Sequence, residues 1–256
     1  MTAPLARTIS SLAAVVMTAA CTSYFEIPIE TPIRPKLDVS AFQRVLVAGF
    51  IAGGTDDVDG NLETTRLLRS QLRTKSDLRV IDTDALPLME VATESRAPGA
   101  APSEADGSTP PGTIREDADL EPYEHVFADV EYWKRIGEEY QQPLIVTGTV
   151  MFAPQARSGI VQRDQEVYDS FGRRRVVPVR TYMERKGFVL KPRFVFIDGR
   201  TGAVLHSENF REEILYNANQ TSPALSSYFE LMDRLIPSFL STLSSQKIKG
   251  TRVLLQ

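Results

Sequence analysis

The amino-acid sequence predicts an α/β (α+β) fold, in which three packed helices cover a mixed sheet of about five strands and a β-hairpin projects from it. Short, continuous apolar runs at 44–50 and 144–152 have the pattern of strands that are covered on both faces. Residues 187–197 and 203–210 flank the turn sequence Asp-Gly-Arg-Thr-Gly, the strongest hairpin signal in the chain. Three further segments carry apolar residues at helical spacing. These segments are 62–74, 126–141 and 224–243.

The first part of the domain reads as strand, helix, strand. The apolar run 44–50 leads through a polar loop into the helix at 62–74. Asp59 or Asn61 can cap the first amide groups of this helix, because both side chains accept hydrogen bonds from backbone N–H groups. A second short strand is expected at 78–82.

Residues 92–121 differ in composition from their surroundings. They are rich in Pro, Ala, Gly, Ser and acidic residues and contain few large apolar side chains. Such a segment buries too little surface to offset its ordering entropy, so we expect a disordered insertion. The helix at 126–141 follows and ends before Pro143. The strand at 144–152 is the longest uninterrupted apolar run, and we expect it in the centre of the sheet.

A hairpin insertion is expected at about 157–181. Residues 160–168 and 174–181 flank a turn candidate at 169–172, and their many charges make them poor core elements. We therefore expect this hairpin to project. Its tip is the one dense basic spot of the chain, a candidate contact for a partner protein or an anionic headgroup. The alternative is a solvated turn whose charges protect an edge strand. The basic residues are Arg173, Arg174 and Arg175.

The only cysteine, Cys21, follows a short N-terminal apolar segment. That segment starts after Arg7, runs from 9 to 16 and ends in small residues, which resembles a bacterial lipoprotein signal. Thr18 departs from the resemblance, since these signals usually carry Leu, Val or Ile there. The run is too short to span a bilayer, which takes roughly 20 apolar residues. An ordinary signal peptide that contains a cysteine is the alternative.

The lipoprotein resemblance implies a division of the chain into three parts. Residues 1–20 would be a signal peptide, 21–41 a Pro-rich tether and 42–256 a single α/β domain with two insertions. Cys21 would carry the lipid that attaches the protein to a membrane. Thr22 follows it instead of the Asp that retains many lipoproteins at the inner membrane, so we expect the periplasmic face of the outer membrane.

Charge and cysteine content exclude several functions. The formal net charge of -4 leaves no basic excess to replace the counterions of nucleic acid, so we expect no nucleic-acid partner. With one cysteine in the chain, a disulfide within it or a thiolate metal site is not expected.

Motifs for catalysis or cofactor binding are incomplete. Thr55 stands where a phosphate-binding loop needs lysine. An EF-hand alignment of the acidic loop 56–61 places Arg66 where a bidentate Glu is required, which leaves only a weak ion site open. The two histidines, His125 and His206, lie far apart. We therefore expect no enzyme, no cofactor and no metal.

The order of elements and several short motifs match a known α/β domain; the motifs contain Phe50, Gly148, Asp198, Thr201, Gly202 and Val204. The chain thereby resembles the α/β domain of the curli-secretion (CsgG-like) lipoproteins and of the N-terminal domain of TolB. The resemblance covers roughly 42–244 without the insertion at 92–121, and it implies a role in the envelope through protein contacts. No catalytic residues come with it.

The predicted function is a lipid-anchored periplasmic or outer-membrane protein that acts through contacts with other envelope proteins in assembly, secretion or regulation. One alternative is a subunit of an oligomeric outer-membrane secretion pore. Charges occur in both alternation phases of 160–189, and each costs roughly 2–4 kcal/mol on a lipid face, which argues against the pore. Another alternative is an envelope hydrolase whose active-site residues are distant in sequence. The oligomeric state stays open.

Overall fold

A computed structural model describes residues 24–95, 114–168, 170–217, 220 and 222–255. The chain divides into two compact units. The larger unit runs from Lys36 to Leu243, and the smaller one combines the N-terminal part up to Pro35 with Ser244–Gln256.

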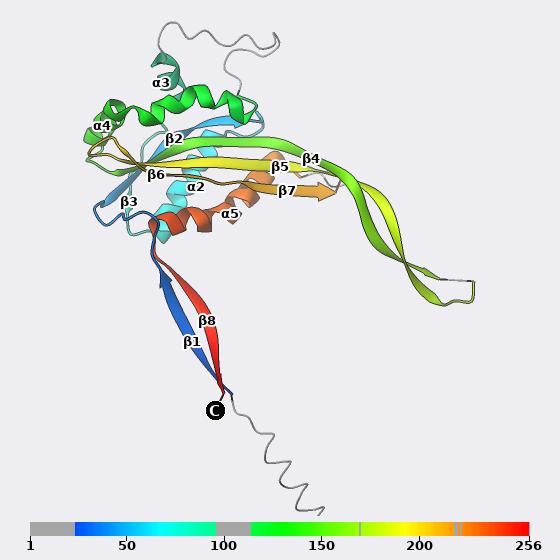
Figure 1. The fold of residues 1–256 in the computed structure, drawn as a ribbon. Coiled ribbons are helices and arrows are strands. Elements are labelled where there is room, and N and C mark those ends of the chain that lie inside the picture. The colour runs from blue at the N-terminus through cyan, green and yellow to red at the C-terminus, as the bar shows by residue number, and fades with distance from the viewer. Residues whose placement is uncertain (1–23, 96–113, 169, 218–219, 221, 256) are drawn as a thin grey trace, which may run out of the picture. The chain divides into compact units, whose positions relative to one another are not determined.

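The larger unit is built on a mixed six-stranded sheet, which confirms the predicted fold class (Figure 1). The strand order is β3-β2-β4-β5-β6, and β7 pairs with β5 beside β6. β2 is parallel to β3 and β4, whereas β5 is antiparallel to β4, β6 and β7. β4 is central, as predicted, and β7 is the strand that was not predicted. The bounds are β2 Arg44–Gly54, β3 Arg79–Val80, β4 Leu144–Tyr168, β5 Arg174–Asp198, β6 Val204–Asn209 and β7 Glu212–Asn217.

Helices cover both faces of the sheet (Figure 1). α2 (Gly60–Lys75) and α5 (Ala224–Leu243) lie on one face, and α3 (Leu88–Glu94) and α4 (Val130–Glu139) lie on the other. Each face has its own buried core, one that contains Phe194 and Phe239 and one that contains Trp133. The layers explain why β2, β4 and β5 are apolar in consecutive residues and not only in alternate ones.

The helix predicted at 126–141 is two elements. A 3₁₀ segment, η2 (Glu121–Ala128), precedes α4, and Asp129 separates them. The carboxylate of Asp129 accepts a hydrogen bond from the amide of Tyr132 at 2.9 Å and so begins α4.

The borders of the predicted disordered insertion at 92–121 are ordered, which corrects that prediction at both ends. Its middle, 96–113, lies outside the described residues. Ala92 belongs to α3, and Ile114 and Leu120 are buried in the core that contains Trp133. Both apolar side chains enter an existing core, and this burial helps to offset the ordering entropy of 114–121.

The smaller unit contains a paired strand within 21–41, the segment that was predicted as a Pro-rich tether. Its β1 (Tyr24–Ile33) forms an antiparallel ribbon with β8 (Gln246–Leu255), in which ten residues of each strand are in register. Lys247 forms an ion pair with Glu30 across the ribbon at 3.3 Å. A partner distant in sequence, β8, therefore supplies the backbone hydrogen bonds of this strand.

Candidate interaction surface

The outer halves of β4 and β5 form an arm, which we define as residues 155–168 and 170–187. The arm is two-stranded except at its base, where Arg185–Gly187 also pair with β7. The antiparallel register runs without interruption from the pair Leu144–Asp198 in the sheet to the pair Tyr168–Arg174 near the turn. The hairpin predicted at 157–181 is therefore the continuation of two sheet strands and not a separate insertion. Figure 1 shows both strands extending beyond β7.

Side chains on the arm are largely exposed, including large apolar ones. Phe171 is 81% exposed, Ile160 73% and Tyr182 67%. Isolated two-stranded hairpins are marginally stable in water, and exposed apolar patches often mark interaction sites, so the arm is the candidate interaction surface of the larger unit.

The register sorts the charges of the arm onto two different faces. Directly paired residues have the same parity, for example Arg163 with Val179, so odd-numbered residues of both strands share one face. We call this odd-numbered side the arginine face and the even-numbered side the mixed face. The arginine face carries Arg157, Arg163, Arg175 and Arg185 among Val161, Val167, Val177, Val179 and Met183.

The arginine face has no carboxylate of its own in the described part of the arm. Two of its guanidinium groups converge on one thioether: Arg163 Nη2 lies 3.9 Å and Arg185 Nε 3.4 Å from the sulfur of Met183. Arg157 donates to Glu213 of β7 at 2.9 Å, at the base of the arm. These contacts place the side chains on one surface, and they leave this face with an excess of positive charge.

The mixed face balances its charges. Its three carboxylates, from Asp164, Glu166 and Glu184, match three cations. Glu166 pairs with Arg174, and Glu184 pairs with Lys186 at 3.1 Å. The cations of this face are Arg174, Arg180 and Lys186.

The basic tip that the sequence suggested is spread over three directions. Arg173 lies in the turn, with its guanidinium 5.3 Å from the ring centre of Phe171. Arg174 belongs to the mixed face, and Arg175, opposite Val167, belongs to the arginine face. Consecutive residues of a strand point to opposite faces, so the triplet does not act as one patch.

Other residues singled out from the sequence have structural roles or lie outside the described residues. Cys21 lies outside them. Asp59 caps α2 by accepting from the amide of Leu62 at 2.9 Å, and Asn61 accepts from the amide of Phe50 at 2.8 Å. Within the described ranges no group of three His, Cys, Asp or Glu residues is placed to hold a metal ion. The helices described there include none long and apolar enough to cross a membrane.

Comparisons with known proteins give weak structural similarity. No family model matches the chain, and no curated protein matches it. Among solved structures, the lipoprotein GNA1162 from Neisseria meningitidis is 12% identical, with a TM-score of 0.34 over 77% of this chain and 97% of that one. A PelC dodecamer from Paraburkholderia phytofirmans is 14% identical, with a TM-score of 0.35 over 86% and 98%. A homologue of the neuraminyllactose-binding hemagglutinin from Helicobacter pylori is 8% identical, with a TM-score of 0.34 over 82% and 86%. Similarities of this size assign the chain to no family.

Proposed function

We propose that this chain is a lipid-anchored protein of the bacterial envelope, on the periplasmic face of the outer membrane, that acts by binding another envelope protein through the arginine face of its arm. The proposed anchor rests on Cys21 and the signal-like segment before it. The proposed mode of action rests on one observation, the separation of charge between the two faces of the arm.

The arginine face suits an acidic protein surface with apolar residues. Arginine is enriched at protein interfaces, where its planar guanidinium binds carboxylates through two parallel hydrogen bonds. The valines between the arginines, such as Val177 at 42% exposure, supply apolar area that a partner would cover. Charge complementarity of this kind speeds association and selects the partner.

Site-specific photocrosslinking in intact cells tests the proposal. A photoreactive residue at Val177, on the arginine face, should give a protein adduct, whereas one at Tyr182, on the mixed face, should give little. The double variant R163Q/R185Q should remove most of the Val177 adduct. The matched control R180Q/K186Q removes two charges from the mixed face and should leave the adduct unchanged.

Three outcomes would contradict the proposal. The Val177 probe could label lipid and no protein, which would make the arm a membrane contact. Adducts could arise only from Tyr182, or R180Q/K186Q could reduce the Val177 adduct as much as R163Q/R185Q does, and either result would remove the special role of the arginine face.

A further inference from the structure

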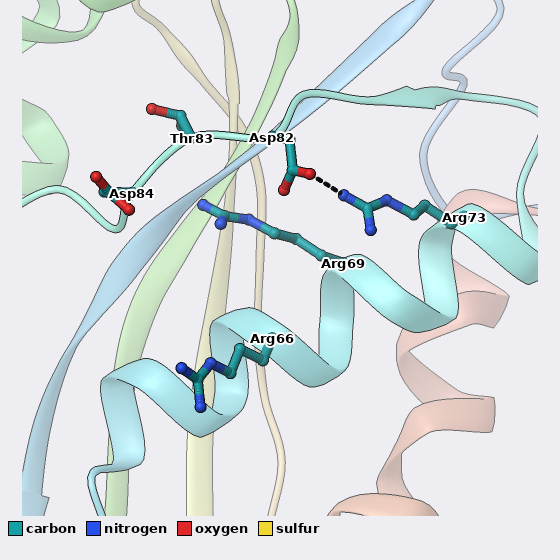
Figure 2. A pocket seen from close by; sticks show the side chains of 6 residues that line it. All are labelled: Arg66, Arg69, Arg73, Asp82, Thr83 and Asp84. Atoms are coloured by element: carbon teal, nitrogen blue, oxygen red, sulfur yellow. Dashed lines mark ion pairs between the residues drawn. The ribbon is translucent and has the colours of Figure 1, made fainter.

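α2 and the loop after β3 enclose a solvent-open cavity of about 570 Å³ (Figure 2). One wall consists of arginines spaced three and four residues apart along α2, which places them on one side of the helix. The other wall comes from the loop and carries two carboxylates and one hydroxyl group. The lining residues are Arg66, Arg69, Arg73, Asp82, Thr83 and Asp84.

Arg69 lies in the middle of the basic wall and is half-buried. Its Nη2 donates to the carbonyl of Val47 at 2.9 Å, next to the place where the register of β2 against β4 shifts. Its Nε is buried and has no hydrogen-bond partner among the described residues. Burial is the main reason that the pKa of Arg69 is lowered; the charge of Arg73 lowers it further, whereas the charges of Asp82 and Asp84 raise it.

The two outer arginines remain accessible from the cavity. Arg73 pairs with Asp82 at 2.8 Å, and its side chain is 50% exposed. Arg66 makes a longer contact, 3.6 Å, with Glu63 and is 66% exposed. Figure 2 shows the guanidinium of Arg69 reaching toward the acidic loop and that of Arg73 beside Asp82, whereas that of Arg66 lies farther from the loop.

This arrangement carries a cost in the free protein. Like charges at the spacing of Arg69 and Arg73 destabilise a helix. A buried N–H group without an acceptor destabilises the folded state as well. The carbonyl of Val47 explains why one donor of Arg69 is needed, but it does not explain three arginines facing one polar cavity. An anion between them would offset the repulsion.

We propose that this cavity binds a small ligand that carries one phosphate group and adjacent hydroxyl groups, such as a polyol phosphate or a lipid headgroup. The phosphate oxygens accept hydrogen bonds from Arg66, Arg69 and Arg73, the residue type best suited to bind phosphate through paired donors. The hydroxyl groups donate to the carboxylates of Asp82 and Asp84, which also disfavour ligands with several negative charges. The volume lies within the range of small-molecule sites, about 300–1,000 Å³.

Calorimetric titration of the purified full chain in detergent tests this proposal. The probes are glycerol 3-phosphate, inorganic phosphate, glycerol and soluble dihexanoyl-phosphatidylglycerol below its micelle concentration. Glycerol 3-phosphate should bind saturably and glycerol should not. R66Q and R73Q should each weaken binding at least about fivefold, since a charge-assisted hydrogen bond contributes more than 1 kcal/mol. R234Q removes an exposed helical arginine of α5 and should leave binding unchanged.

D84N separates the two halves of the proposal. It removes an acceptor for ligand hydroxyl groups and also a charge that repels phosphate. It should therefore weaken the binding of glycerol 3-phosphate and strengthen the binding of inorganic phosphate. Tighter binding of dihexanoyl-phosphatidylglycerol than of glycerol 3-phosphate would identify a lipid headgroup as the source of the phosphate, and the reverse order a soluble phosphate ester. The proposal fails if none of the three phosphate probes binds saturably, or if R66Q and R73Q bind them as R234Q does.

Discussion

Ile160 and Tyr182 lie directly opposite each other on the two strands of the arm, and both remain exposed to solvent. Cross-strand pairs of an aromatic and a β-branched residue stabilise a hairpin by roughly 0.2–1 kcal/mol. This pair is on the mixed face, where charges are balanced. We therefore expect it to stabilise only the part of the arm around these two residues.

Replacing both residues by threonine should leave the folded core intact. We expect the free energy of unfolding to fall by less than about 1 kcal/mol, because exposed substitutions away from special features have small effects. Urea unfolding measures it. As a core reference, Phe194→Ala should cost about 3–5 kcal/mol, since Phe194 is fully buried. A loss in I160T/Y182T that approaches the loss in F194A would mean that the arm is covered in solution.

Tyr228 of α5 and Thr64 of α2 join through their hydroxyl groups in the buried core. Burial raises the pKa of Tyr228. Y228F should leave Thr64 with only the carbonyl of Gly60, 2.5 Å away, and lower the free energy of unfolding by about 1–3 kcal/mol. Removing both hydroxyl groups in T64V/Y228F should cost less than the sum of the single changes, because each single change already removes the hydrogen bond between them. Additive losses would indicate that the hydroxyl pair contributes no coupling energy.

Gly137 of α4 contacts the turn between β5 and β6 so closely that a methyl group there would overlap the carbonyl oxygen of Gly199. In an exposed helix, glycine to alanine stabilises by about 1 kcal/mol. The overlap should reverse the sign in G137A and lower the melting temperature by several degrees. G159A on the arm is the control, because nothing lies within 4 Å of its new methyl group. Equal melting temperatures for the two variants would contradict the close packing.

The sequence predicted the strands and helices whose apolar pattern is typical of only one kind of secondary structure. The apolar run from Leu144 lies in the centre of the sheet, and the stripe of α5 is buried from Tyr228 to Leu243. It did not predict β7 or the pairing of β1 with β8. The pairing of these strands depends on which strands lie beside them in the folded protein. Strands of mixed polarity carry no residue pattern from which the paired strand can be predicted.

The charge separation on the arm was within reach of the sequence, but the cavity was not. Placing the turn between Tyr168 and Arg174 fixes the parity of every pair, and a shift of one residue would have mixed the two faces. The cavity requires the loop at Asp82–Asp84 to lie beside α2. Nothing in the spacing of Arg66, Arg69 and Arg73 distinguishes such a wall from a solvated helix face.

The anchor prediction concerns Cys21, which lies outside the described residues. Replacing Cys21 by serine should abolish incorporation of a labelled fatty acid and release the protein from the membrane fraction, since acyl chains anchor at about 0.8 kcal/mol per buried CH₂ group. Thr18→Leu restores the usual residue of lipoprotein signals and should raise incorporation or leave it unchanged. Equal labelling of C21S and the unaltered protein would exclude the lipid attachment.

Glu208 of β6 connects β6 with α5 and with Lys36, which precedes β2. Its carboxylate accepts from Thr242 of α5 at 3.0 Å and contacts Lys36 and His206. Burial alone would raise the pKa of Glu208, but hydrogen bonds from Lys36, Thr242 and His206 outweigh it and hold the pKa below its ordinary value of 4.5.

A lowered pKa in the folded state means that the stabilisation is complete above the unfolded-state pKa and is lost as the pH falls through the folded-state pKa. In urea unfolding between about pH 6 and pH 3, the free energy of unfolding of E208Q should therefore fall furthest below that of the unaltered protein at pH 6 and least at pH 3. T242V, which removes one of the donors, should show an intermediate dependence on pH. A gap between E208Q and the unaltered protein that stays constant or widens on acidification would contradict the role of the ionised carboxylate.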